Sequence, residues 1–193
     1  AMVEGQYLGE LQVVGLDKGA AIFAYMDNTP PYMPHSGSID IPADIDGFPV
    51  LMVGEITSSI PVTRLTIPES VVFVDDGLIA NLDGLTEIVV AEGNKRLSAR
   101  DGMLFSKDMR NLIGVAGGLT SVTVPGSVEE IYRDAFRACG RLERVTLQDG
   151  IKTIEEGCFK DCHSLRQVDI PDSVTSIERE AFLGCSDALF DRT

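Results

Sequence analysis

The sequence predicts an α/β repeat solenoid, a short horseshoe of about six 23-residue repeats with parallel strands on its concave face. Three sets of residues recur at a step of 23 positions: Cys139, Cys162 and Cys185; Phe136, Phe159 and Phe182; and Ile131, Ile154 and Ile177. A fixed period of about 20 to 30 residues is typical of a solenoid, in which each repeat adds one turn and neighbouring repeats bury a continuous core.

The repeats can be counted from the residue that ends each strand-like segment. These anchor residues are, in chain order, Pro42, Pro68, Ala91, Pro125, Gln148 and Pro171. Their spacings are 26, 23, 34, 23 and 23 residues, which places insertions in the first and third intervals. Alignment on the anchors brings apolar residues into common columns, such as Val71, Val128, Ile151 and Val174. We therefore expect about six turns stacked on these columns.

Within one repeat, the spacing of Leu142, Val145 and Leu147 predicts a short strand with alternate side chains directed inward. Where the anchor is proline, the strand ends because proline cannot donate to a ladder. The following run, such as SVEEIYRDAFRAC, places apolar residues at uneven steps, which favours a turn and a short helix beneath the strand. One strand and one short helix per repeat is the leucine-rich-repeat arrangement.

Two segments depart from this pattern. At about 98–117, the turn-like SKDMR separates strand-like runs at 103–105 and 112–115, so we expect a β-hairpin insertion in place of the helix. Near the N-terminus, LQVV and AAIFAY flank GLDKG, which predicts a β-hairpin that caps the stack. The division that follows is an N-terminal β cap with a Pro-rich connecting loop at 1–38, and repeats at 39–193.

Composition and charge restrict the classes of partner that we expect for this protein. The formal net charge is −14 and no basic stripe is present, so we expect no nucleic-acid partner. No apolar run approaches the roughly 18 residues that a transmembrane helix needs, so no transmembrane segment is expected. The first residues, AMVEGQYLGELQ, contain neither the basic nor the apolar segment of a signal peptide.

Four cysteines and a histidine raise the question of a metal or redox site. Cys158, Cys162 and His163 could form part of a zinc site. However, Leu82 and Ser59 occupy the cysteine column in earlier repeats, so the column favours small or medium side chains that pack. Stacked cysteines with parallel Cβ vectors also suit a disulfide poorly. We expect a ladder of free, packed thiols, and neither a metal ion nor a cofactor.

Carboxylate clusters and histidines give no stronger site. Asp40, Asp44 and Asp46 lie close together and Asp75 adjoins Asp76, but no 12-residue calcium loop with a central glycine and a closing glutamate is present. We expect solvated turn carboxylates there. The chain has 2 histidines, and no arrangement of base and nucleophile emerges from the spacing. The sequence therefore predicts a protein that is not an enzyme.

The strand positions that alternate with the buried columns form the one surface with a functional argument, because solenoids bind partners on such extended faces. The candidate partner-binding residues on the concave face are Arg64, Thr66, Glu87, Ser121, Thr123, Arg144, Thr146, Arg166, Gln167 and Asp169. Arg144 and Arg166 suggest a local basic spot that could meet a carboxylate or sulfate. A solvated face without a ligand is the alternative, and the insertion at 101–115 is a second candidate surface.

The segments VPGSVEEIYRDAFRACGRL, LQDGIKTIEEGCFKDCHSL and IPDSVTSIEREAFLGC resemble the unit of the BspA-like leucine-rich-repeat family of bacterial surface proteins. DGMLFSKDMRNLIGV also resembles an insertion that recurs in that family. The departures are Leu82 and Ser59 in the cysteine column, Cys158 in the alanine column and Gln148 in place of proline. The resemblance implies a cell-surface or secreted location and a non-catalytic module for adhesion or for binding a protein or glycan. The alternative is a scaffolding segment of a larger repeat array with no ligand of its own.

Overall fold

The computed structural model of the protein describes most of the repeat region and the strands of the N-terminal part. The residues described are 6–8, 11–16, 20–26, 37–45, 47–57, 61–75, 77–185 and 189–192. The Pro-rich connecting loop predicted within the 1–38 segment, at 28–38, lies outside them except for its last two residues. Asp46 and Asp76 of the carboxylate clusters also lie outside them.

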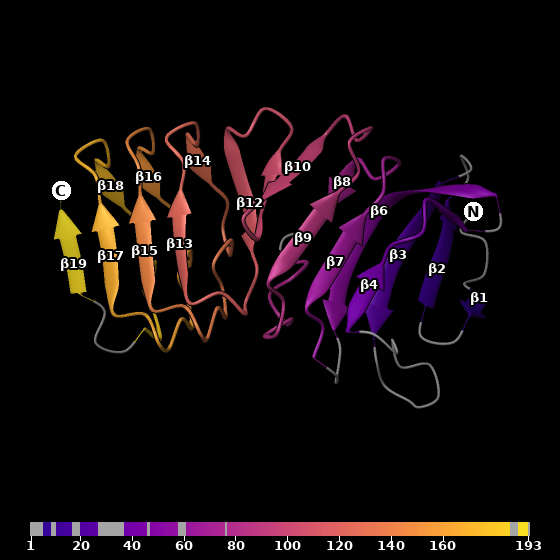
Figure 1. Ribbon diagram of the computed structural model, residues 1–193, viewed down its shortest axis with the longest axis horizontal. Coiled ribbons are helices and arrows are strands. Elements are labelled where there is room, and N and C mark those ends of the chain that lie inside the picture. The colour runs from indigo at the N-terminus through magenta and orange to yellow at the C-terminus, as the bar shows by residue number, and fades with distance from the viewer. Residues whose placement is uncertain are drawn as a thin grey trace.

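The chain forms a β-solenoid of about six turns, elongated along the stacking direction (Figure 1). Its strands are β1 (Gln6–Leu8), β2 (Leu11–Leu16), β3 (Ala20–Met26), β4 (Ser38–Asp40), β5 (Asp44–Ile45), β6 (Phe48–Thr57), β7 (Arg64–Ile67), β8 (Phe73–Val74), β9 (Glu87–Val90), β10 (Leu97–Arg100), β11 (Met103–Ser106), β12 (Asn111–Val115), β13 (Ser121–Val124), β14 (Glu130–Ile131), β15 (Arg144–Leu147), β16 (Thr153–Ile154), β17 (Gln167–Ile170), β18 (Ser176–Ile177) and β19 (Leu189–Arg192). No helix occurs among the described residues, so none there could cross a membrane.

Each regular turn contributes a four-residue strand to one side of the molecule and a two-residue strand to the other. The longer strands form two parallel sheets, β4-β7-β9 and β13-β15-β17-β19. The shorter strands pair in parallel on the opposite side, as in β16 with β18 (Figure 1). Equivalent residues of successive turns are register partners, for example Val122 with Val145 and Val145 with Val168. The parallel repeat is therefore confirmed.

The predicted columns form the core. Val71, Val128, Ile151 and Val174 are all buried, as are Leu85, Leu142 and Leu165. Stacking continues in the aromatic column, where the ring centroids of Phe136 and Phe159 lie 4.5 Å apart and those of Phe159 and Phe182 lie 5.0 Å apart. Burial of such side chains out of water is the main stabilising contribution to a fold of this kind.

The predicted α/β class and its short helix are wrong for the described repeats. Asp134 and Ala138 have left-handed backbones, with φ of 63° and 57°, and a right-handed helix cannot continue through them. Two N–H groups of this segment also bond across the stack: Phe136 donates to the Cys158 carbonyl at 3.1 Å and Ala138 to that of Lys160 at 3.0 Å. These amides are thus used between turns, and the segment forms a tight turn.

The third interval contains three antiparallel strands, of which the sequence analysis anticipated two. β11 pairs with β12, at the positions of the two runs flanking SKDMR. β10 pairs with β11 around a two-residue turn at Asp101 and Gly102, whose φ values of 53° and 73° are both positive, as a hairpin turn requires. β12 then rejoins the solenoid by pairing in parallel with β14.

The N-terminal strands extend one sheet of the solenoid. β2 and β3 lie antiparallel, with Leu11 paired to Tyr25, and β1 adds to β2. β3 then pairs in parallel with β6, which carries β8 on its other side. That this hairpin acts as a cap stays a prediction, as does the proposed division of the chain at 38/39.

Candidate binding face

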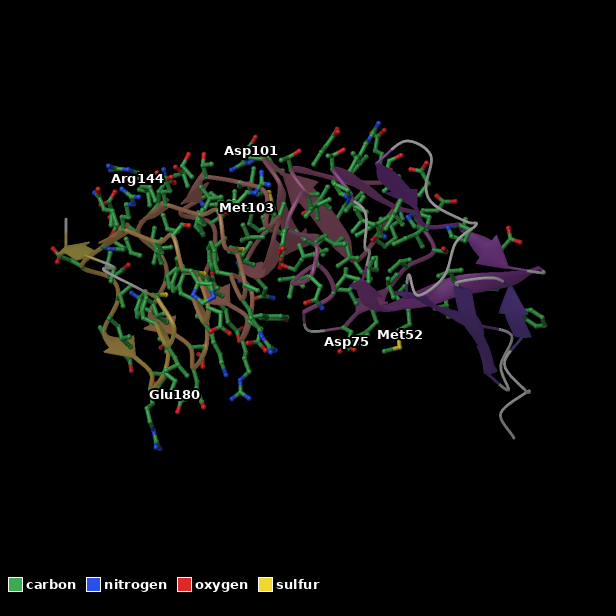
Figure 2. The ribbon with its side chains drawn as sticks, turned by 90° about the horizontal axis from the view of Figure 1, so that it is seen from below. Met52, Asp75, Asp101, Met103, Arg144 and Glu180 are labelled. Carbon is green, nitrogen blue, oxygen red and sulfur yellow. The ribbon has the colours of Figure 1, made fainter. Side chains whose placement is uncertain are left out.

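The strand face is defined here as the outward-directed side chains of β7, β9, β13, β15 and β17. It carries nine of the ten predicted residues: Arg64, Thr66, Glu87, Ser121, Thr123, Arg144, Thr146, Gln167 and Asp169. The tenth, Arg166, is exposed but immediately precedes β17. Figure 2 shows Arg144 and Asp101 on one side of the molecule, with Glu180, Asp75 and Met52 on the opposite side.

Strand register brings these residues into two ladders. Ser121, Arg144 and Gln167 are successive partners in one of them. In the second ladder, Thr123, Thr146 and Asp169 follow one another. Because neighbouring strands of a sheet lie about 4.8 Å apart, each ladder presents polar groups at regular intervals.

The predicted basic spot is neutralised in part. Arg144 pairs in register with Gln167, whereas Arg166 aligns with Glu143, whose carbonyl accepts the Arg166 N–H at 2.9 Å. The Arg144 guanidinium lies 4.0 Å from the carboxylate of Asp169. The face therefore pairs opposite charges at Arg144, where the sequence analysis expected two arginines together.

Asp169 organises the centre of the strand face. Its carboxylate accepts hydrogen bonds from Thr146 Oγ1 at 3.1 Å and from Gln167 Nε2 at 2.6 Å, and it lies near Arg144. Only 16% of its side chain is exposed, against 55% for Arg144. On the other part of the face, Arg64 Nε lies 3.5 Å from the Glu87 carboxylate. These contacts hold side chains in place that a partner would otherwise have to order.

A groove of about 620 Å³ interrupts the strand face after β9. It is lined by β9, by the end of β10 with its turn, and by Leu119. The apolar lining includes Val90, Ala99 and Leu119, half-buried side chains that pack against the N-terminal core. Glu87, Arg100 and Asp101 supply exposed charges, and Arg100 lies 3.5 Å from Asp101. This groove was not predicted from the sequence, in which the Asp-Gly pair after β10 is the signal for an additional hairpin.

The thiols are arranged as a packed ladder. Cys162 Sγ donates to the Phe136 carbonyl at 2.9 Å and Cys185 Sγ to the Phe159 carbonyl at 3.0 Å, so each thiol bonds to an earlier turn. Cys139 and Cys158 are buried, and all four cysteines are free. Burial raises the pKa of Cys139 to about 12 and raises that of Cys158 well above its usual value. Such thiols are poor nucleophiles, because the thiolate is the reactive form.

Cys162 and Cys185 form a linked pair at the end of this ladder. The interaction with Cys185, together with burial, raises the pKa of Cys162, while the interaction with Cys162 lowers the pKa of the half-buried Cys185. Beside them, His163 Nδ1 lies 2.9 Å from the Gly184 carbonyl. Among the described residues, no three or more His, Cys, Asp or Glu side chains are placed to hold a metal ion.

One carboxylate of the predicted turn clusters, that of Asp44, stabilises local structure. Asp44 Oδ1 accepts the Gly47 N–H at 3.3 Å, which closes a turn before β6. In the insertion, Asp108 Oδ1 accepts a hydrogen bond from Ser106 Oγ at 2.7 Å, and this bond lowers the pKa of Asp108.

Comparison with known proteins agrees with the observed stack. Residues 116–189 match the family described as BspA type Leucine rich repeat region, with six copies. The pneumococcal vaccine antigen PcpA is similar in structure, with a TM-score of 0.55 and 15% identity, over 100% of this chain and 81% of that one. The T. pallidum Leucine Rich Repeat protein (TpLRR) also has a TM-score of 0.55, with 23% identity over 96% of this chain and 91% of its own. No curated protein matches the chain.

Proposed function

Because residues 116–189 form a BspA-type leucine-rich repeat region, we propose that the chain is a non-catalytic module that binds a protein or glycan through its strand face. The observation that carries this proposal is the pair of register-aligned polar ladders on β13, β15 and β17. An extended face of this kind offers many shallow contacts, which suits a partner that lies across several turns. The proposed setting is the surface of a bacterial cell or its surroundings.

Two features of the face support recognition of a polar partner. Ser121, Thr123 and Arg144 are exposed and offer hydroxyl and guanidinium donors on neighbouring strands. Asp169 limits the motion of Arg144 and Thr146, so less side-chain entropy is lost when a partner binds. Together these groups suit carboxylates, amides or sugar hydroxyls.

The absence of catalysis is also part of the proposal. The raised pKa values of Cys139 and Cys158 favour a packing role for these cysteines. The Cys162 thiol next to His163 in the chain is buried and donates to the Phe136 carbonyl, which also favours a packing role.

One observation favours the second candidate function, a scaffolding segment without a ligand. The Asp169 carboxylate already contacts Arg144, Thr146 and Gln167, so part of the face is satisfied internally. Exposed ion pairs of this sort also occur on surfaces that bind nothing.

Binding of the purified chain to immobilised matrix proteins and glycans tests the proposal, with Arg144→Glu as the disruptive variant. The new carboxylate would lie beside Asp169, and we expect at least about a tenfold loss of affinity, which corresponds to about 1.4 kcal/mol. Arg179→Glu is the matched control, because it makes the same charge change next to Glu180 on the opposite side (Figure 2). Absence of binding by the unaltered chain, or equal loss in both variants, would favour the scaffold.

A further inference from the structure

The groove after β9 lies over the outward side of two neighbouring strands. β10 lies directly beside β9, and the turn that follows β10 places Asp101 on the same side of the molecule as Arg144 (Figure 2). Val89 alternates with the buried Ile88 and so projects to that side too. With a volume of about 620 Å³, the groove lies within the usual range for a site that holds a small ligand.

Close contacts fix the wall that this turn forms. The Gly102 carbonyl accepts the Ala116 N–H at 2.9 Å. Gly102 also approaches its neighbours so closely that an added Cβ would lie 2.9 Å from the Thr86 carbonyl oxygen and 2.7 Å from Leu119 Cδ1. The wall is therefore formed before a ligand binds, which reduces the entropy cost of binding.

The floor of the groove is apolar, unlike the rest of the strand face. Val89 is the only apolar side chain among the ten outward positions that the structure describes on β7, β9, β13, β15 and β17. Val90, Ala99 and Leu119 extend this apolar surface, and all four side chains are half-buried. A ligand that fills the groove must therefore present an apolar surface to its floor.

Two exposed ion pairs border the groove, and the charges within each pair balance. Arg100 Nε lies 3.5 Å from the Asp101 carboxylate, and Arg64 Nε lies 3.5 Å from that of Glu87. Glu87, Arg100 and Asp101 line the groove directly. At least half of each of these four side chains is exposed, so a ligand can reach them. The border has no excess of either charge, and it offers both donors and acceptors of hydrogen bonds.

The border and the floor together specify the chemistry of the ligand. A hydroxyl group both donates and accepts hydrogen bonds, so neighbouring hydroxyls can bind a guanidinium and a carboxylate at once. A charged ligand would be attracted by one member of each ion pair and repelled by the other. A pyranose ring carries hydroxyls at its edge and C–H groups on its face, which match the charged border and the apolar floor.

We propose that this groove binds a neutral sugar residue of a glycan, with one face of the ring on the apolar floor and its hydroxyls at the two ion pairs. This inference rests on the proposed binding function and specifies both the class of ligand and the position of its site. The ligand lies over the outward side of β9 and β10, so neither strand has to move to admit it.

The probes are the neutral disaccharides lactose, maltose and cellobiose, titrated into the full chain with ¹³C-labelled valine and leucine methyl groups. We expect saturable shifts of the Val89 and Leu119 methyl signals with at least one probe. Saturation transferred from these methyl groups should reach the C–H protons of the bound sugar. The charged sugars glucosamine and glucuronate should bind no more tightly than the best neutral probe, because the border has no excess charge.

Variants of the chain locate the site. Glu87→Gln keeps the shape of the side chain but removes its charge, and it should weaken sugar binding at least about fivefold. Glu129→Gln is the matched control, since Glu129 is 62% exposed, pairs with Arg110 at 3.6 Å and does not line the groove. Val89→Asp places a charge in the apolar floor and should abolish binding. If Val89→Asp does not fold, the Glu87 and Glu129 variants still decide the question.

Three results would overturn the inference: no saturable binding of any neutral probe, equal loss in Glu87→Gln and Glu129→Gln, or tighter binding of a charged sugar. The peptide acetyl-Ala-Val-Ala-Val-Ala-amide tests a polypeptide as the occupant. Tighter binding of this peptide than of the sugars, with shifts of the Val89 and Leu119 methyl signals, would also overturn it.

The broader proposed function is tested separately. Glycan binding that is lost in Arg144→Glu but kept in Glu87→Gln would place the partner on β13, β15 and β17 and not in the groove. Sugar binding that is kept in Arg144→Glu and lost in Glu87→Gln would support the groove and contradict the proposal for the strand face.

Discussion

Replacing Asn94 by valine tests whether hydrogen bonding or apolar stacking decides the structure at the start of the insertion. Asn94 occupies the column of Val71 and Val128, and its side chain is fully buried. Its Nδ2 donates to the carbonyls of Pro68 and Val71, both at 2.9 Å. Its Oδ1 accepts the N–H groups of Arg96 and Leu97, both at 2.8 Å.

The magnitude follows from which groups water can reach. The bonds to Val71 and Leu97 are buried, and those to Pro68 and Arg96 are only partly so. Leaving a buried polar group without a partner costs about 1 to 3 kcal/mol, so the two buried groups together account for roughly 2 to 6 kcal/mol. Apolar burial of valine offsets about 1 kcal/mol of this. We expect a net loss of about 1 to 5 kcal/mol of unfolding free energy.

Urea unfolding followed by circular dichroism measures this loss, with the slope against urea compared to show that the folded state is preserved. Thr86→Val is the control, because it removes one exposed hydrogen bond, to the Thr63 carbonyl at 3.3 Å, with little change of shape. The control should lose less than about 1 kcal/mol. Equal or greater stability of Asn94→Val would refute the reasoning, since it would mean that the apolar column outweighs the four bonds.

Four further predictions follow from the core, the turns and the titrating groups. Phe159→Ala should lose about 3 to 5 kcal/mol of unfolding free energy in urea, because its buried ring stacks on both neighbours, and Phe182→Ala should lose less because Phe182 is only half-buried. In the same assay, Gly102→Ala should lose about 1 to 3 kcal/mol more unfolding free energy than Gly77→Ala. Both glycines have φ above 70°, but only at Gly102 would the new Cβ meet a backbone oxygen, that of Thr86 at 2.9 Å. In thiol titration, Cys185 should react before Cys139 and Cys158, because its pKa is lowered while burial raises theirs; equal rates in the native protein would contradict this order. The pKa of Asp108 is lowered on folding, so its contribution to stability is present above the unfolded pKa and is lost as pH falls through the folded pKa. Asp108→Asn should therefore lose less stability on acidification than the unaltered chain. Parallel profiles of stability against pH for the two proteins would disprove this.

The columns of buried apolar residues could be predicted because the repeat itself requires them. Each turn must bury the same positions against the turn before it, so Val128, Ile151 and Val174 recur as apolar residues and are buried. Period-two alternation likewise indicated which side chains of β13, β15 and β17 face outward. These are local rules, and they hold wherever the period is uninterrupted.

The short helix was predicted wrongly because the hydrogen bonds that favour a tight turn over a helix are not local interactions. Asp134 and Ala138 are not glycines, so the sequence gives little sign that both adopt a left-handed backbone. Hydrogen bonds from Phe136 and Ala138 to the next turn favour this conformation over a helix, and they exist only once the turns are stacked. Tertiary pairing therefore overrides the helical tendency of the segment.

The candidate site was likewise predictable only in part from the sequence. Alternation placed Arg144 and Asp169 on the strand face, but their 4.0 Å approach depends on side chains from different turns. The groove depends on β10, which lies beside β9 without pairing to it. Spacing alone does not show where an insertion will leave the stack.

The 23-residue period by itself determined that this chain is a stack of parallel strands, because only stacking buries columns that recur at that step. Folding of the whole chain decided how each turn closes, where the strand face is interrupted and which of its charges meet. The physical reason is that apolar burial follows from the identity of single residues. Backbone hydrogen bonds between turns and ion pairs across strands depend on distances that exist only in the assembled structure.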